Sequence, residues 1–457
     1  MNYFKIRILL LLFFCGLAGC DHFVDVEVPT SQLTGRVVFE DRSTANAAMV
    51  AVYSKLRDSG LLTGTGIGSG VCLGLYADEL IYYGTNDDNV SFLFGNTLLS
   101  TTSIVSQKWN ESYHQIYCAN AVIEGCQNST LLSINDKNQF IGEATFVRAL
   151  VHFYLMNLYG DLPYITTTNY EVNRVAPRMA TAQVYDLIIA DLEQAIALLP
   201  EAYITADRVR PNRSTASALL SRVYLYKGDW AAASNAASAV LNNTDYVWEN
   251  DIDKIFLKES SATIWQFSPM SEGTNADEGA SFIFQSGPPP NVGLRPELVH
   301  LFDSNDLRKT HWIATITDGI NTWYHANKFK QNSSTGSSVE YSVVFRLAEQ
   351  YLIRAEARAR QGELTGAKED LNKVRNTAGL SDTPATTADE IIAAVLQERR
   401  FELFTEYGHR FFDLKRSGAL DTFLPLVKSG WNSTDQLWAI PEIELLSNPN
   451  FTQNPGY

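Results

Sequence analysis

The sequence predicts a mainly α-helical protein that is built from paired helices and interrupted by two long irregular insertions. Apolar residues recur at helical spacing through most of the chain. Two helical stretches are split at a single glycine, Gly228 and Gly362, as expected for two helices joined by a short turn. Two segments, near residues 60–105 and 245–340, lack this periodicity and mix glycine, proline and asparagine with aromatic residues. We therefore expect a helical scaffold with loop insertions and a few short strands.

The first nineteen residues are expected to form a targeting segment that is not part of the fold. Lys5 and Arg7 supply its positive charge, and a short apolar run over residues 8–17 follows. This run is shorter than the ~20 residues that a membrane-spanning helix needs. The tetrapeptide LAGC at 17–20 looks like a lipobox, in which Cys20 is lipidated. The chain is therefore predicted to comprise a lipoprotein signal peptide at 1–19 and one domain over residues 20–457.

Charge and cysteine content exclude several classes of protein. Acidic residues outnumber basic ones by 51 to 36, which argues against a nucleic-acid-binding protein. Cys118 and Cys126 are eight residues apart on one predicted helix, too far for a disulfide, and are interpreted as small buried residues. The glycine-rich run at 60–70 lacks phosphate-binding spacing, so no cofactor is predicted and a flexible loop is expected. Asn/Asp clusters at 86–89 and 242–245 lack EF-hand spacing, so no metal is predicted.

The helices that we predict from apolar periodicity cover residues 44–56, 106–126, 139–159, 181–199, 214–227, 230–241, 344–361 and 363–377. The first insertion includes a polar and aromatic segment from Tyr76 to Leu99 that we expect to be irregular. In the second insertion, from Thr263 to Ser337, short β-prone runs alternate with Gly and Pro turns. Long irregular segments inside a compact domain are often functional, so both insertions are candidates for the binding region.

Two of the predicted helix pairs follow one plan. The stretch ASALLSRVYLYKGDWAAASNAASAVL around Gly228 is similar to a tetratricopeptide repeat, with large apolar residues on one helix facing alanines on the next. The pair around Gly362 repeats this arrangement. Because these breaks are far apart in the chain, the repeats are scattered and not tandem. We expect tetratricopeptide-like pairs to form a right-handed scaffold with long insertions.

Residues 398–418 (ERRFELFTEYGHRFFDLKRSG) combine four phenylalanines with many charged side chains. Phe401, Phe404 and Phe411 fall on one helical face, which predicts a single central helix clasped between other helices. Glu406 and Arg410 are four residues apart and could form a local ion pair. Charges drawn into an apolar setting need partners, so we interpret the stretch as structural and not catalytic.

Four stretches of this sequence resemble the SusD/RagB family of outer-membrane nutrient-binding lipoproteins. They are GEATFVRALVHFYLMNLYGDLP at 142–163, FRLAEQYLIRAEARARQG at 345–362, the 398–418 stretch, and LWAIPEIELLSNPNFTQNPGY at 437–457. The resemblance covers the chain from the lipobox to Tyr457. One departure is Ala439-Ile440-Pro441, which lacks the first proline that is often found there.

This resemblance implies a lipid-anchored, non-enzymatic protein on the outer face of the outer membrane. Family members bind oligosaccharides, or in some cases peptides, and pass them to a partner SusC-like TonB-dependent transporter. A peptide-binding member of the same architecture remains an alternative. A glycoside hydrolase is a further alternative, because it needs only two suitably spaced carboxylates and acidic residues are abundant. A purely structural assembly module is the last alternative.

Ligand-contacting residues are expected in the two insertions, since sugars stack on aromatic faces and bond to neighbouring polar groups. The candidates are Asp78, Tyr82, Tyr83, Asn86, Asp87, Asn89, Phe92, Trp265, Trp312, Trp323 and Tyr324. Among them, Trp265 lies in TIWQF, a run that also reads as a buried strand. Two other tryptophans, Trp109 and Trp230, lie on helical faces and are predicted to be core residues. Asp306 and Arg308 are predicted to form an ion-paired turn that stabilises the fold.

Overall fold

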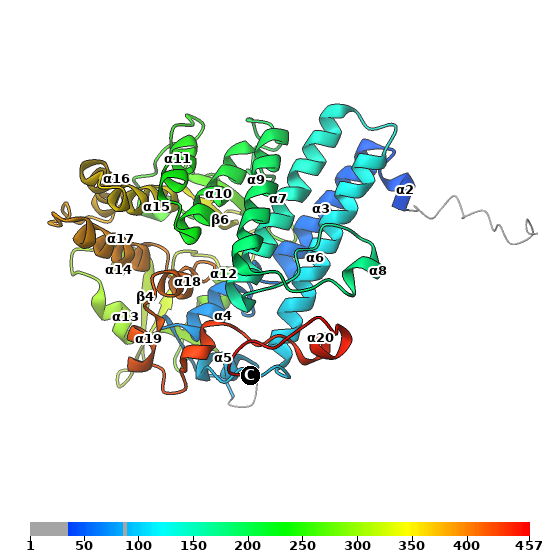
Figure 1. Cartoon of the computed structure of the whole chain (residues 1–457). Coiled ribbons are helices and arrows are strands. Elements are labelled where there is room, and N and C mark those ends of the chain that lie inside the picture. The colour runs from blue at the N-terminus through cyan, green and yellow to red at the C-terminus, as the bar shows by residue number, and fades with distance from the viewer. Residues whose placement is uncertain (1–34, 86–88) are drawn as a thin grey trace, which may run out of the picture.

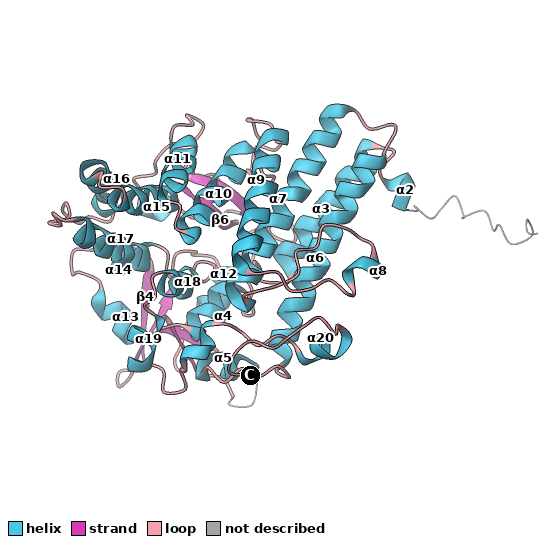
Figure 2. Cartoon of the chain, viewed as in Figure 1, coloured by secondary structure: helices cyan, strands magenta, loops and turns pink. Residues whose placement is uncertain are grey.

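A computed structural model of the protein describes residues 35–85 and 89–457, so the predicted signal peptide, Cys20, Asn86 and Asp87 lie outside the described residues. The described part is mainly helical, with a few short strands, as predicted (Figures 1 and 2). Within these ranges, no helix has the length and apolar character needed to cross a membrane.

The long helices form a continuous array in which each helix packs on the next. In chain order they are α3 (Arg42–Asp58), α6 (Ser103–Asn128), α7 (Ile134–Tyr159), α9 (Thr181–Leu198), α10 (Arg213–Lys227), α11 (Trp230–Leu241), α15 (Leu347–Arg360), α16 (Leu364–Thr377) and α17 (Ala388–Glu402). Helix α11 packs directly on α15 although the second insertion separates them in the chain (Figure 1). The scattered repeats are therefore neighbours in space.

The α10–α11 pair shows why these residues form two close helices. The Asn212 side chain accepts a hydrogen bond from the Thr215 N–H in a capping box that starts α10. Gly228 ends α10 in the left-handed region, at φ 83°, which favours glycine. Ala233 and Ala237 of α11 are buried in a cluster that also contains Ala357 of α15. Small side chains at these positions let three helix backbones approach closely.

Two small sheets carry the strands. Strands β2 (Thr263–Phe267) and β6 (Ser342–Arg346) form an antiparallel pair, and β1 (Leu80–Tyr82), β3 (Val292–Leu294), β5 (Thr322–Ala326) and β4 (Ile313–Thr317) form an antiparallel sheet in that order. The remaining elements are short: α2 (Gly35–Val38), α4 (Ser69–Tyr76), α5 (Asn89–Gly95), α8 (Tyr170–Asn173), η2 (Ile252–Lys254), α12 (Asp277–Phe282), α13 (Pro296–Leu301), α14 (Leu307–His311), α18 (His409–Arg416), α19 (Leu420–Phe423), η3 (Leu424–Leu426), η4 (Ser433–Gln436) and α20 (Glu442–Ser447).

The prediction of a single helix over residues 398–418 is wrong. Helix α17 ends at Glu402 and α18 begins at His409, with Thr405, Tyr407 and Gly408 at positive φ between them. The Lys328 ammonium donates to the carbonyl oxygens of Glu402 and Phe404, both at 2.8 Å. These carbonyls would otherwise accept bonds from the next helical turn, so a buried lysine from the second insertion helps to end α17.

Some charges of this stretch pair locally, as predicted, since Asp413 binds Arg416 three residues on, but Glu406 and Arg410 pair with distant segments and not with each other. Arg346 lies 2.5 Å from Glu402 and 2.8 Å from Glu406, while Arg410 pairs with Asp78 at 2.7 Å. Arg308 forms the predicted turn with Asp306 and also contacts Glu402. Burial opposes ionisation of Glu402, but Arg346 and Arg308 outweigh it and lower the pKa of this carboxyl.

Three further predictions need correction. The run at 60–70 is not a flexible loop, because most of it is buried and α4 begins within it at Ser69. The Tyr76–Leu99 segment contains β1 and α5, so it is not wholly irregular. The helix predicted from residue 344 begins at Leu347, because residues 342–346 form strand β6. In each case a contact with a distant segment decides the local structure.

Candidate aromatic binding face

The two predicted insertions meet in the four-stranded sheet. Strand β1 comes from the first insertion, and β3, β5 and β4 come from the second. Leu80 pairs with Leu294, which in turn pairs with Tyr324 of β5. Directly opposed residues of an antiparallel sheet share a face, so these three side chains lie on one side of it. Leu80 and Leu294 are buried there, which identifies this side as the one that faces the core.

The opposite side of the sheet carries aromatic rings that are partly exposed. Alternation along β1 and β5 places Ile81 and Trp323 on this side, and Tyr83 continues it, with its N–H bonded to the Asn291 carbonyl at 2.7 Å. Gly293, which pairs with Ile81, lies on the same side, and a Cβ built on it would be 3.3 Å from Cε2 of Tyr83. We call the surface formed by Ile81, Tyr83, Gly293 and Trp323 the aromatic face.

The rings of the aromatic face are held by close packing. A Cβ built on Gly287 would lie 2.1 Å from the Trp323 ring, so this indole packs directly on the Gly287 backbone. Partial burial raises the pKa of the Tyr83 hydroxyl, an effect that nearby Arg295 opposes. Two ordered rings with polar neighbours on a sheet surface fit the stacking chemistry of a sugar.

A groove of about 440 Å³ opens beside this sheet edge. Tyr82, Asn291 and Val292 line one side, and the loop at 65–67 and helix α12 line the other, with Asp277 and Ser281. Tyr82 and Tyr83 are adjacent on extended backbone, so their side chains point to opposite sides of the sheet. Tyr82 lines the groove, and Tyr83 lies on the aromatic face. The volume lies within the usual range for small-ligand sites.

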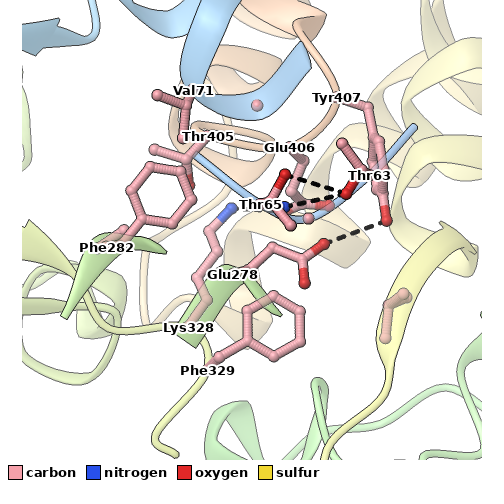
Figure 3. A pocket seen from close by; sticks show the side chains of 14 residues that line it. Thr63, Thr65, Val71, Glu278, Phe282, Lys328, Phe329, Thr405, Glu406 and Tyr407 are labelled. Atoms are coloured by element: carbon pink, nitrogen blue, oxygen red, sulfur yellow. Dashed lines mark hydrogen bonds and ion pairs between the residues drawn. The ribbon is translucent and has the colours of Figure 1, made fainter. Parts of the chain in front are cut away.

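A second, enclosed cavity shares Thr65 and Val71 with the lining of the groove and contains buried charged groups (Figure 3). It has room for only about 20 Å³, roughly one water molecule, so it is too small for a sugar. Glu278 of α12 points into it and accepts hydrogen bonds from Ser342, at 2.7 Å, and Tyr407, at 3.3 Å. Burial raises the pKa of Glu278 to about 7 and lowers that of Lys328 to about 8. This cluster links α12, which lines the groove, to β6 and to the α17–α18 junction.

The structure brings four of the predicted residues together. Tyr82, Tyr83, Trp323 and Tyr324 lie on the β1–β3–β5 part of the sheet, and all four are partly buried. Tyr324 lies on the core-facing side and packs edge-on near His300, with ring centroids 6.2 Å apart. Tyr83 and Trp323 therefore lie on the aromatic face, Tyr82 lines the groove from the core-facing side of the sheet, and Tyr324 lies on that same side without lining the groove.

Three predicted residues lie in the core instead. Trp265 and Trp312 are 0% and 1% exposed, and their indole N–H groups donate to the carbonyls of Val209 and Ile252. A buried ring has no face to offer a ligand. Asp78 is also buried and binds the guanidinium groups of Arg400 and Arg410. We therefore remove these three residues from the candidate site.

The remaining candidates occupy α5. The Asn89 side chain accepts bonds from Ser103 Oγ and the Ile104 N–H, so it fixes the start of α6. Phe92 is exposed, whereas Val90 is the α5 residue that lines the groove. Asn291, Asp277 and Ser281 were missed by sequence reasoning. Asn291 follows three consecutive prolines and precedes a β-prone run, a turn signal that could have drawn attention to it.

The described residues contain no group of three or more His, Cys, Asp or Glu side chains that could hold a metal ion. Among residues 35–85 and 89–457, Asp277 is the only carboxylate that lines the groove. Cys72 and Cys126 are buried free thiols, and Cys118 is a partly buried one. The prediction of a small buried residue is therefore confirmed for Cys126 and holds only partly for Cys118.

Family models match two parts of the chain. Residues 84–225 match a family described as "Starch-binding associating with outer membrane", and residues 304–457 match the SusD family. SusD-like protein P25 of Formosa agariphila is 25% identical over 98% of each chain. The starch-binding protein SusD of Bacteroides thetaiotaomicron is 32% identical over 33% of this chain and 28% of that protein.

Solved structures share the fold. A SusD superfamily protein from Bacteroides vulgatus superposes with a TM-score of 0.78 at 20% identity, covering 92% of this chain and all of that one. A laminarin-binding SusD-like protein gives 0.77 at 24% identity, covering 91% and 99%. Surface glycan-binding protein A of Bacteroides thetaiotaomicron, in complex with laminarihexaose, gives 0.76 at 19%, covering 90% and 99%.

The fold is a scaffold of paired helices that carries loop insertions, and solved SusD superfamily structures share it. Within this fold class, the chain belongs to the SusD/RagB family of glycan-binding proteins.

Proposed function

We propose that this protein is a cell-surface lipoprotein that captures oligosaccharide on the aromatic face and in the groove at the edge of the same sheet. The observation that carries the proposal is the pair of part-exposed rings, Tyr83 and Trp323, held on one side of a sheet whose edge also borders a 440 Å³ groove. Rigid aromatic surfaces bind sugar rings with little loss of side-chain entropy. Asn291, Ser281 and Asp277 supply hydrogen-bonding groups within the groove.

The protein then delivers the captured ligand to a partner SusC-like TonB-dependent transporter in the outer membrane. Lipid on Cys20 anchors it there, facing the cell exterior. Support comes from the lipobox in the sequence and from the matched family, whose description names association with the outer membrane. The choice of a SusC-like transporter as the partner rests on the family resemblance.

Carbohydrate binding can be tested on the soluble form, residues 21–457, by isothermal titration calorimetry and affinity gel electrophoresis. Laminarin and starch oligosaccharides are the first probes, because similar proteins are described as binding laminarin or starch. We expect Tyr83→Ala and Trp323→Ala each to weaken binding about tenfold, or about 1.4 kcal/mol.

Ile320→Ala provides the matched control, because Ile320 is exposed at the β4–β5 turn and belongs to neither the aromatic face nor the groove. It should bind like the wild type. An affinity within twofold of wild type for both aromatic variants would remove the aromatic face from the proposal.

A further inference from the structure

One row of α6 presents three aromatic side chains whose exposure increases along the helix. Trp109, Tyr113 and Tyr117 follow at four-residue steps, each about 6 Å along the axis. Trp109 is buried, Tyr113 is partly buried and Tyr117 is 50% exposed. All three line a groove of about 390 Å³ that is closed by α8 and α20. An ordinary core stripe would be buried along its whole length.

The base of this groove is rigid. The rings of Trp109 and Tyr113 have centroids 4.8 Å apart, and Phe451 packs edge-on against Trp109 at 6.0 Å. The Tyr113 hydroxyl donates to the Pro163 carbonyl at 2.9 Å, which fixes the ring that adjoins Tyr117. A ligand entering this groove would therefore meet a surface that is already ordered, so little conformational entropy is lost on binding.

The rim carries a second exposed ring. Tyr170, the first residue of α8, lines the same groove and is 72% exposed. Within residues 35–85 and 89–457, neither the Tyr117 nor the Tyr170 hydroxyl has a hydrogen-bond partner. Tyrosine supplies a large, amphipathic contact surface at low entropic cost, and here both its ring and its hydroxyl remain available.

The polar groups of the groove favour an uncharged ligand. Arg174 and Glu444 contribute one charge of each sign. Asn110 is exposed, and the Asn173 amide nitrogen bonds to Thr167, which leaves its oxygen available to a ligand hydroxyl. Aromatic rings beside amide groups, without net charge, match the needs of a neutral sugar chain.

We propose that this α6–α8–α20 groove is a second carbohydrate-binding subsite, which takes a neutral oligosaccharide by stacking on Tyr117 and Tyr170. The inference rests on the proposed glycan-binding function. The groove shares no lining residue with the one at the edge of the four-stranded sheet. A polysaccharide long enough to reach both subsites would bind with increased avidity.

Calorimetry with laminarihexaose and maltohexaose measures how many hexasaccharide sites the soluble form, residues 21–457, contains. This number tests the inference. We expect two sites in the wild type and one in Tyr117→Ala/Tyr170→Ala, with the affinity of the remaining site within twofold of its wild-type value. Tyr83→Ala/Trp323→Ala should also retain one site, and the four-residue variant none. Tyr117→Phe/Tyr170→Phe, which keeps both rings, should retain two.

The outcomes separate this inference from the proposed function. A single wild-type site that Tyr83→Ala/Trp323→Ala removes and Tyr117→Ala/Tyr170→Ala leaves intact would overturn the second subsite and preserve the first. A single site lost only in the α6–α8–α20 variant would support this inference and overturn the aromatic face. A wild type that binds neither sugar would overturn both.

Exposed aliphatic side chains that do not line the groove provide the control and the competing outcome. Leu131→Ala removes an exposed apolar side chain that does not line the groove, and should leave both sites unchanged. Val172 and Leu446 are exposed on α8 and α20. If Tyr117→Ala/Tyr170→Ala left the number of sugar sites unchanged and weakened co-purification with the transporter, the groove would be a protein interface and the subsite would be overturned.

Discussion

At the scale of single residues, two glycines determine where the rings of the aromatic face lie. Gly287 and Gly293 are positions at which a side chain would meet Trp323 or Tyr83. The missing Cβ atoms leave the space that the rings occupy, and no special φ is involved at either glycine. The position of each ring therefore depends on a residue that no ligand needs to touch.

Gly287→Ala should displace the Trp323 ring, because the added Cβ would lie 2.1 Å from it. We expect carbohydrate affinity to fall about as far as in Trp323→Ala, roughly tenfold. Overpacking should lower the free energy of unfolding by about 1–3 kcal/mol, so the variant remains folded. Titration calorimetry and tryptophan fluorescence measure the two effects. Wild-type affinity together with an unchanged fluorescence spectrum would show that the ring does not rest on Gly287.

Glu278, which lines the enclosed cavity, makes stability depend on pH. Burial raises its pKa to about 7, so the folded protein holds a proton that the unfolded chain releases near pH 4.5. The folded state therefore binds more protons between these values, and the contribution of Glu278 to stability falls as pH rises from about 4.5 to 7. Glu79, whose pKa burial also raises to about 7, acts in the same direction.

Replacing this carboxyl should remove its share of the pH dependence. In urea denaturation, Glu278→Gln should gain stability relative to wild type as pH rises from 5 to 8, because the amide cannot ionise. Glu201→Gln, at an exposed position, should show a constant difference. A Glu278→Gln difference that is equally constant would place the pKa of Glu278 near its ordinary value.

At the scale of elements, the α17–α18 junction is held by buried ion pairs and not by local helical contacts. Arg346 reaches it from the end of β6, and Lys328 reaches it from the end of the second insertion. Together they bind both the carboxylates and the carbonyls of residues 402–406. The turn between the helices is therefore specified by two segments from elsewhere in the chain.

Arg346→Met should lower the free energy of unfolding by about 3–5 kcal/mol, because it leaves the buried Glu402 and Glu406 without a shared partner. Arg174→Met offers a matched control, since Arg174 pairs with Glu171 at the surface and should matter by less than about 1 kcal/mol. Chemical denaturation measures both variants. A loss below about 1 kcal/mol for Arg346→Met would mean that Lys328 and Arg308 compensate fully.

Helices could be predicted where the signals are local. The capping box at Asn212 and the left-handed turn at Gly228 lie within or beside the helix they delimit, so the α10–α11 pair agrees with its prediction. The break after Glu402 could not be predicted, because it depends on Lys328, which is far away in the chain. Local periodicity carries no information about a distant donor.

The candidate site could be predicted only to the level of the two insertions. Trp265 and Trp323 occur in similar β-prone runs, yet the first lies in the core and the second lies on the aromatic face. Strand β2 pairs with β6 among the scaffold helices, whereas β5 belongs to the sheet at the junction of the insertions. Strand pairing and register decide which side chains face outward, and neither is encoded in the run itself.

At the scale of the whole molecule, residues 391–414 connect three apolar clusters. Ile391 and Val395 pack with α15 and α16, Phe404 packs with the second insertion, and Phe411 and Leu414 pack with the long helices. This stretch therefore joins the parts of the domain that the insertions separate, and we expect them to unfold together.

Phe404→Ala should lower the free energy of unfolding by about 3–5 kcal/mol, because its ring is fully buried between elements of the second insertion. Scanning calorimetry should still show one transition, at a lower temperature than wild type. Two separated transitions, or unequal calorimetric and van't Hoff enthalpies, would mean that the insertions unfold independently of the scaffold.

Attachment to the membrane depends on a single side chain in our proposal. Cys20→Ala should shift the full-length protein out of the membrane fraction, because it removes the thiol that carries the lipid in our proposal. Cell fractionation and metabolic labelling with palmitate measure the change, and Cys118→Ala is the control. Retention of the Cys20→Ala protein in the membrane fraction would contradict the lipobox.

The aromatic face takes Tyr83 from one insertion and Trp323 from another, with most of the helical array encoded between them. A chain emerging from the export machinery thus has no competent surface until its last strands have docked. Before that pairing, neither ring has the position on which our proposed capture of carbohydrate depends.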